Sequence, residues 1–317
     1  MADYLQVEGA PSGAPVTRIF EFDGTFIENL AMLPDGRLLL TTFGSGGLYV
    51  LDPDATNPAA ESLLSPDGCT GLSGIAALGD DKYAVSGGLH QPFRFQEGSM
   101  KVYIVSLSTQ PSSAVVVDAI PVPDTRMMNG MVALPNKPHV ILSADSLGGR
   151  ILRVDTSTRE ASVAFTDAAL DPSEDNPTHP LGVNGIRILG SYLYFANSSQ
   201  GTFARFPIDD DGNKIGDVDI IARLEGEDRV TYAYDDFALD SHGNAYVAVH
   251  PSSVVKITPD GKQTTIAANR ADLMFREPTS VLVAKDSKSI YVSTGGKTIG
   301  GKRYGGQIIQ VDISSQI

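Results

Sequence analysis

The sequence is poor in cysteine, in basic residues and in long apolar runs, and each shortage excludes a class of protein. Cys69 is the single cysteine among 317 residues, so an internal disulfide and a cysteine-based zinc site are both excluded. Lys and Arg total 24 against 38 Asp and Glu, and the formal net charge of −14 argues against nucleic acid or an anionic membrane as a partner. No apolar run approaches the roughly 18 residues that a membrane-spanning helix needs.

Two further patterns are missing. No segment has a convincing helical hydrophobic period, so we expect an all-β fold. The opening residues 1–15, MADYLQVEGAPSGAP, lack the basic-then-apolar form of a signal peptide. We therefore expect a leader over 1–15 and, for the chain as given, a cytoplasmic location.

Six related segments run through the rest of the chain. Each has a short apolar strand, a tight turn, a second strand, a loop and a third strand. Their starts are spaced by roughly 44 to 56 residues, which suits the four-stranded blade of a β-propeller. The segments start at residues 28, 73, 129, 184, 235 and 279.

The repeats predict one all-β domain over residues 1–317, a six-bladed β-propeller with four-stranded blades. Turn sequences such as PDG and SHGN join the first strand of a repeat to the second, as in β-hairpins. A lone strand at 16–22 precedes the first repeat. We expect it to pair near 307–313 as the outer strand of the last blade, which would close the ring.

Aligning the repeats on their first strands places a side-chain oxygen at the first position of all six. If these strands line the propeller axis, the six oxygens form a ring at one mouth of the central channel. The six residues are Glu28, Ser73, Asn129, Asn184, Asp235 and Thr279.

Four members of this ring match the ligand set of a hard divalent cation. Glu28 and Asp235 supply carboxylates, and Asn129 and Asn184 supply amide oxygens. Ca²⁺ and Mg²⁺ prefer such oxygen ligands, and we expect one ion here, with Ca²⁺ favoured. The alternative is that these residues cap the sheets or hold channel water.

The ends of the second strands and the loops that enter the first strands should lie on the same face as the ring. Long loops on such a face usually carry specificity. The residues expected to contact a substrate there are Phe43, Ser73, Met127, Met128, His179, Asn197, Tyr232, Tyr234, Phe275 and Thr279.

Three histidines fall on the predicted metal face. His90, His179 and His250 are candidates for a proton carrier near neutral pH, and the alternative for each is a hydrogen bond that holds a loop. Asp235 is the candidate for activating or positioning an attacking water. We therefore take Asp235, His90 and His250 as the catalytic candidates.

Several motifs together resemble a known family. They are Glu28 before LPDGRLLL, NG at 129–130, VNGIRI at 183–188 and DDFALDSHGNAYVA at 235–248. The chain resembles the senescence-marker-protein, gluconolactonase and luciferin-regenerating-enzyme-like propellers, with paraoxonases as distant relatives. Within that group it is most similar to a branch common in fungi. The resemblance implies a metal held by Glu28, Asn129, Asn184 and Asp235, with Asp236 as a further candidate ligand.

The chain departs from the sugar-lactonase members of this family. Those members place an arginine two residues before the ligand asparagine and an aspartate just after it, where this chain has Met127 and Gly130. The predicted mouth is also rich in methionine and aromatic residues. We therefore expect a lipophilic polyketide or terpenoid as the substrate, in place of a hydrated sugar lactone.

Three functions remain open from the sequence. The first is metal-dependent hydrolysis of a lactone or ester, in which a cation stabilises the developing oxyanion. The second, implied by the fungal branch, is a hetero-Diels–Alder cyclisation of a polyketide quinone methide with a terpene. The third is a binding propeller with a structural ion.

Overall fold

The computed structural model describes residues 15–107, 113–268 and 275–316. Within these ranges the regular secondary structure is almost entirely β-strand, which confirms the all-β class. The exceptions are two short helical turns, α1 (Asp228–Thr231) and η1 (Ser314–Gln316). No helix in the described ranges is long and apolar enough to cross a membrane. Residues 1–14 of the expected leader lie outside the described residues.

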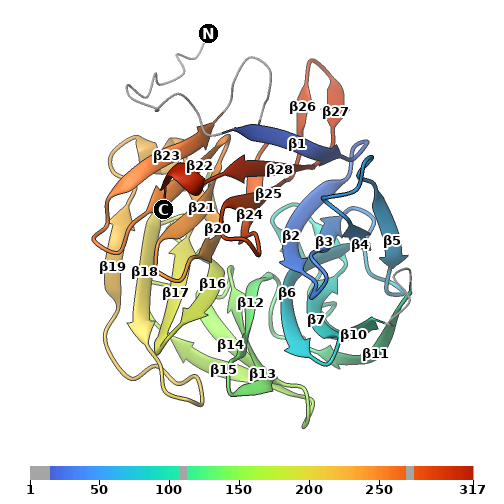
Figure 1. Cartoon of the computed structure of the whole chain (residues 1–317). Coiled ribbons are helices and arrows are strands. Elements are labelled where there is room, and N and C mark those ends of the chain that lie inside the picture. The colour runs from blue at the N-terminus through green and yellow to red at the C-terminus, as the bar shows by residue number, and fades with distance from the viewer. Residues whose placement is uncertain (1–14, 108–112, 269–274, 317) are drawn as a thin grey trace.

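Three four-stranded antiparallel sheets follow the chain in simple sequential order (Figure 1). The first contains β12 (Met128–Leu134), β13 (Lys137–Asp145), β14 (Arg150–Asp155) and β15 (Glu160–Thr166). The second contains β16 (Val183–Leu189), β17 (Tyr192–Asn197), β18 (Thr202–Pro207) and β19 (Asp219–Arg223). The third contains β20 (Ala233–Leu239), β21 (Ala245–His250), β22 (Ser253–Ile257) and β23 (Gln263–Ala268).

A fourth sheet joins the two ends of the chain. Its strand order is β1 (Val16–Glu21), β28 (Gln307–Asp312), β25 (Ser289–Thr294) and β24 (Pro278–Val283). Val16 pairs with Val311, and Glu21 pairs with Gln307. The predicted closure by the N-terminal strand is therefore confirmed.

The remaining large sheet has eight strands in two four-stranded halves. The first half contains β2 (Phe26–Met32), β3 (Leu38–Phe43), β4 (Leu48–Leu51) and β5 (Ala60–Leu64). The second half contains β6 (Gly71–Gly79), β7 (Lys82–Gly88), β10 (Lys101–Leu107) and β11 (Ala114–Pro121). A single pair, Phe43 with Gly71, joins β3 to β6 and so links the halves.

Two small hairpins complete the strands. They are β8 (His90–Gln91) with β9 (Arg94–Phe95), and β26 (Lys297–Ile299) with β27 (Lys302–Tyr304). The second hairpin stands out from the rim of the molecule in Figure 1.

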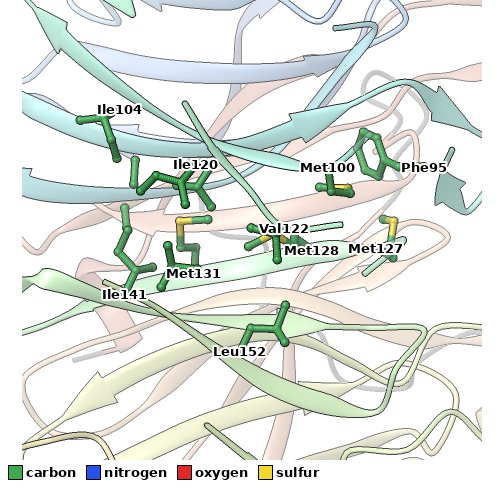
Figure 2. Close-up of a cluster of buried hydrophobic side chains, with 14 residues drawn as sticks. Phe95, Met100, Ile104, Ile120, Val122, Met127, Met128, Met131, Ile141 and Leu152 are labelled. Carbon is green, nitrogen blue, oxygen red and sulfur yellow. The ribbon is translucent and has the colours of Figure 1, made fainter. Parts of the chain in front are cut away.

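The first strands of the repeats form a closed ring around the centre of the molecule. In turn β2 contacts β6, β6 contacts β12, β12 contacts β16, β16 contacts β20, β20 contacts β24, and β24 contacts β2. Apolar side chains fill the spaces between adjacent sheets: Ile104 and Ile120 of one sheet pack with Ile141 and Leu152 of the next (Figure 2). This packing fixes the sheets around the ring and so positions the residues at its mouth.

Candidate active site

Every ring strand is interrupted where its repeat carries the side-chain oxygen. The pairing of β2 with β3 skips Glu28, that of β16 with β17 skips Asn184, and that of β20 with β21 skips Asp235. The ladders of β6, β12 and β24 skip the equivalent residues. A β-bulge leaves its residue unpaired and re-aims the side chain, as is frequent beside functional sites. The shared position in the repeats is therefore a shared backbone irregularity.

Four of these six residues line one cavity of about 780 Å³. Glu28, Asn129, Asn184 and Asp235 all contribute to its wall, and each is at most 7% exposed. These are the two carboxylates and two amides that the sequence grouped as cation ligands. The structure thus brings the four together in a buried setting, where an unpaired polar oxygen is costly.

The other two ring residues bond to protein. Ser73 Oγ donates to the carbonyl of Met128 at 2.7 Å, and Thr279 Oγ1 donates to the carbonyl of Ile27 at 2.9 Å. Each short side chain thereby links its strand to the next strand of the ring. Neither residue is among those that line the cavity, so the structure does not support the prediction that they contact a substrate.

Hydrogen bonding fixes the orientation of the Asn184 amide. Ser198 Oγ donates to the carbonyl of Tyr234 at 2.7 Å, so it is an acceptor for Asn184 Nδ2 at 3.0 Å. The opposite atom, Asn184 Oδ1, is buried without a hydrogen-bond partner. Among the described residues, no hydrogen bond reaches the Glu28 carboxylate or the Asn129 side chain. Three residues of the cavity wall therefore offer oxygens that lack a protein donor.

Asp235 is the end of a carboxylate–histidine–carboxylate chain. His250 Nε2 lies 2.7 Å from Asp235 Oδ2, and His250 Nδ1 lies 2.9 Å from Glu277 Oε2. Lys297 Nζ donates to the other Glu277 oxygen at 2.9 Å. Burial lowers the pKa of His250, but its bonds to the two carboxylates outweigh burial and raise that pKa to about 10. His250 is then an imidazolium that donates to both acids.

The two ring carboxylates destabilise each other. Burial raises the pKa of Glu28 well above its usual range, and the nearby charge of Asp235 raises it further. Burial also raises the pKa of Asp235, although the hydrogen bond from His250 opposes that shift. Two buried anions with one shared imidazolium favour an additional positive charge.

These donors fit a hard divalent cation. The set contains carboxylate and amide oxygens and neither sulfur nor imidazole, which is the preference of Ca²⁺ and Mg²⁺. In the described part of the chain, no three His, Cys, Asp or Glu side chains cluster as a metal site. The amides are therefore needed, and the orphaned Asn184 Oδ1 is the atom that an ion would satisfy.

Asp236 belongs to a different layer. Its Oδ2 accepts from Asn29 Nδ2 at 2.9 Å and from Arg187 Nη2 at 2.8 Å, and Ser280 Oγ lies 3.0 Å away. The backbone N–H of Phe237 donates to Oδ1 at 2.8 Å. Asp236 is not among the residues that line the cavity, so the structure does not support it as a further ligand. Protein donors already satisfy its oxygens.

The cavity wall on the β2–β6 side is aromatic. Phe43 stacks on His90 with ring centroids 3.9 Å apart, and Phe26 stacks on the other side of Phe43 at 5.2 Å. Burial lowers the pKa of His90 to about 4, so this ring is neutral near pH 7. His90 therefore contributes an aromatic surface, and no carboxylate partner supports it as the predicted catalytic residue.

Met127 and His179 also line the cavity, as the sequence predicted. Burial lowers the pKa of His179, and its Nε2 is buried with no partner among the described residues. A neutral imidazole with a free ring nitrogen is an acceptor for a substrate hydroxyl.

Five other predicted contact residues do not line the cavity. Met128 lies in the apolar cluster of Figure 2, between the β6 and β12 sheets. Tyr234 and Phe275 are core residues, and Tyr232 packs at the edge of the Tyr234 cluster. Asn197 donates to the carbonyls of Ala169 and Asp171 and so holds a loop.

Sequence reasoning missed several cavity residues. Glu277 lies two residues before the ring position Thr279, and Phe26 lies two residues before Glu28. The position two residues before a ring residue was therefore the available signal. Arg303 lies in the β26–β27 hairpin and also lines the cavity, together with Phe93 and Leu181. The long insertions in the sequence predicted which face of the molecule carries the cavity. They did not predict which of their side chains line it.

Comparisons with known proteins identify relatives of this chain. The model of the SMP-30/Gluconolactonase/LRE-like region matches residues 181–296. A protein of Phoma sp named "Putative hetero-Diels-Alderase" is 26% identical over 307 residues, which cover 86% of this chain and 84% of that protein.

Two solved structures share the fold. A luciferin-regenerating enzyme superposes with a TM-score of 0.67 at 14% identity, over 95% of both chains. A calcium-binding protein, regucalcin, from Agrobacterium tumefaciens superposes with a TM-score of 0.60 at 14% identity, also over 95% of both. At this identity they show the fold alone. The resemblance predicted from the sequence motifs is confirmed by these matches.

Proposed function

We propose that the chain is a cation-dependent enzyme that transforms a lipophilic small molecule in the cavity over the strand ring. The observation that carries this proposal is the set of buried oxygens without protein donors, Glu28, Asn129 and Asn184 Oδ1, beside the Asp235 carboxylate. Glu28, Asn129, Asn184 and Asp235 would hold Ca²⁺ or Mg²⁺. When bound, such an ion polarises a carbonyl oxygen and stabilises developing negative charge on it.

We propose as well that the fold is a single six-bladed β-propeller. The two halves of the eight-stranded sheet share only the Phe43–Gly71 pair, so we count them as two blades. With the four other sheets they give one blade for each strand of the closed ring.

Hydrolysis of a lactone or ester is the first reaction we propose. His250 holds the Asp235 carboxylate by a 2.7 Å bond, and Glu277 orients the imidazole from its other side. The Asp235 carboxylate would accept a proton from an attacking water. Phe26, Phe43 and His90 exclude bulk water on one side and bind the apolar part of the substrate.

Cyclisation is the second candidate, and the relative from Phoma sp favours it because the match extends over most of this chain. In that reaction the apolar wall would orient a conjugated polyketide, such as a quinone methide, against a terpene. Holding two reactants in a reactive geometry lowers a barrier by about 7–11 kcal/mol. Asp235 and His250 then act through hydrogen bonds, without an attacking water.

The experiment compares turnover of an aryl or long-chain lactone with that of gluconolactone, in calcium and in EDTA. We expect turnover of the apolar lactone only, with loss in EDTA and in Asp235→Asn. The control Asp67→Asn removes an exposed carboxylate that does not line the cavity and should keep full activity. Equal or faster turnover of gluconolactone would contradict the lipophilic substrate.

If neither lactone is hydrolysed, the cyclase is tested directly. The stereoselectivity of cyclisation of a quinone methide with a terpene is compared between the wild type and Leu181→Arg, which places a charge in the cavity wall. Binding of apolar ligands with no turnover of any kind would leave a binding propeller with a structural ion.

A further inference from the structure

The β26–β27 hairpin is basic although the protein is acidic. Lys297, Lys302 and Arg303 lie within seven residues of one another in a chain whose net charge is −14. Lys297 is paired with Glu277, whereas Lys302 and Arg303 have no carboxylate partner among the described residues. The hairpin therefore carries an unbalanced positive charge at the rim.

Arg303 is the member of this hairpin that lines the cavity. Its Nη2 donates to the carbonyl of Gly295 at 2.7 Å, which holds the guanidinium in place. The remaining guanidinium N–H groups have no partner in the described ranges. A guanidinium presents its donors in a rigid planar fork that matches an anionic oxygen pair. The Arg303 side chain is thus held in place while most of its N–H donors remain free to bind a ligand.

The surface beside Arg303 is aromatic. Gly295 packs so tightly on Phe26 that a Cβ at Gly295 would lie 2.1 Å from Phe26 Cε2. Phe26 begins the stack that continues through Phe43 to His90. All three rings also line the cavity, so they form a continuous aromatic wall against which a flat apolar body can pack.

The bottom of the cavity imposes the opposite charge preference. Glu28 and Asp235 line another part of the cavity wall, and a ligand carboxylate would meet like charge there in the metal-free protein. Without a bound cation, an anionic group on a ligand is therefore favoured at the hairpin.

We propose that Arg303 binds an anionic oxygen, a carboxylate or phenolate, on a substrate whose flat apolar body lies along Phe26, Phe43 and His90. The substrate class is then an acidic, conjugated lipophile. This inference rests on the proposed function only in taking the cavity as the substrate site.

The test measures binding and requires no turnover. The dissociation constants of 2-naphthoate and of neutral 2-naphthalenemethanol are determined in EDTA, so that no metal competes for the carboxylate. Four proteins are compared: wild type, Arg303→Gln, Arg303→Lys and the control Lys302→Gln, whose side chain is on the same hairpin but does not line the cavity.

We expect Arg303→Gln to weaken naphthoate by about tenfold, the scale of one hydrogen bond to a charged group, while the alcohol binds as before. Arg303→Lys should recover part of the loss, and Lys302→Gln should leave the ratio of the two constants unchanged. An equal loss for both ligands would show that Arg303 only holds the hairpin, and unchanged naphthoate binding would also overturn the proposal. If neither ligand binds the wild type, flat aromatic acids are not the ligand class of this cavity and the proposal is overturned, whereas the proposed function is tested separately by lactone turnover in calcium.

Discussion

Two successive layers of polar residues lie in the strand ring, and they differ in how their hydrogen bonds are satisfied. In the inner layer, Asn29, Ser280 and Arg187 all converge on Asp236, whose carboxylate has four donor contacts. In the cavity layer, Glu28 and Asn129 have no side-chain partner among the described residues, and Asn184 Oδ1 is buried alone. Three residues of the inner layer, Asn29, Asp236 and Ser280, each directly follow a ring residue in the sequence.

The difference separates a structural layer from a functional one. The inner layer pairs its anion with a guanidinium and closes the ring without any ligand. The cavity layer places two repelling carboxylates around one imidazolium and leaves amide oxygens open. The hydrogen bonds of the inner layer already join the strands of the ring. The cavity layer, whose oxygens lack protein donors, is therefore not needed to hold the ring together. We infer that the cavity layer is completed by a ligand.

The largest effect should come from a substitution in the inner layer. Asp236→Asn leaves the guanidinium of Arg187, which is 24% exposed, without its anion. Removal of one partner of a fully buried pair costs about 3–5 kcal/mol, so we take the lower end, about 3 kcal/mol. We expect the free energy of unfolding in urea to fall by that amount. Glu28→Gln, in the cavity layer, should not lower the free energy of unfolding in EDTA. Equal destabilisation by the two variants would show that both layers are structural. Asp67→Asn is the control for a surface carboxylate.

A second effect should arise where the layers meet. Gly185 follows Asn184, and a Cβ at this position would lie 2.2 Å from Asp236 Oδ1. Gly185→Ala should therefore displace the Asp236 carboxylate and cost about 1–3 kcal/mol of unfolding free energy, the usual range for overpacking. The same variant combined with Asp236→Asn should cost less than the sum of the two single changes. Strict additivity would mean that the alanine strain does not act through Asp236.

The smallest effect concerns His90, one of the three histidines that line the cavity. Burial holds the pKa of His90 at about 4, below its ordinary 6.5, so folding is favoured while this ring is neutral. That stability is present above pH 6.5 and is lost as the pH falls towards 4. His90→Gln should therefore lose less stability than the wild type over this interval. The difference should be a fraction of about 1.4 kcal/mol per pH unit, since part of the ring is solvated.

The check is the unfolding free energy of both proteins between pH 7 and 4. Parallel curves would show that His90 titrates normally and is not desolvated by the stack. If the unfolding free energy of His90→Gln fell more steeply than that of the wild type, the prediction would be contradicted.

The sequence repeats predicted the ring positions because a shared position in six repeats must share a place in the fold. Strand alternation could not decide between neighbouring residues there, because each ring strand carries a bulge at that point. The bulge explains why Asp235 faces the cavity and Asp236 the inner layer.

Other parts of the site depend on contacts between distant segments. Glu277 acquires its position from His250, 27 residues earlier, and Arg303 from the path of a hairpin between β25 and β28. The sequence around either residue contains no pattern that predicts these contacts. Tyr232 and Phe275 were expected at the mouth from their place in the entering loops, but burial in the apolar clusters determined where they pack.

The most direct test is whether calcium binds to the cavity layer. Binding is measured by calorimetric unfolding of the wild type and of Glu28→Gln, each with and without calcium. The account predicts that calcium raises the unfolding temperature of the wild type, since a ligand at 100 times its Kd adds about 2.7 kcal/mol. It predicts that Glu28→Gln is at least as stable as the wild type in EDTA and gains nothing from calcium or magnesium. An unshifted wild type in millimolar calcium and magnesium, or an equal shift in Glu28→Gln, would contradict the claim that a cation completes the cavity layer.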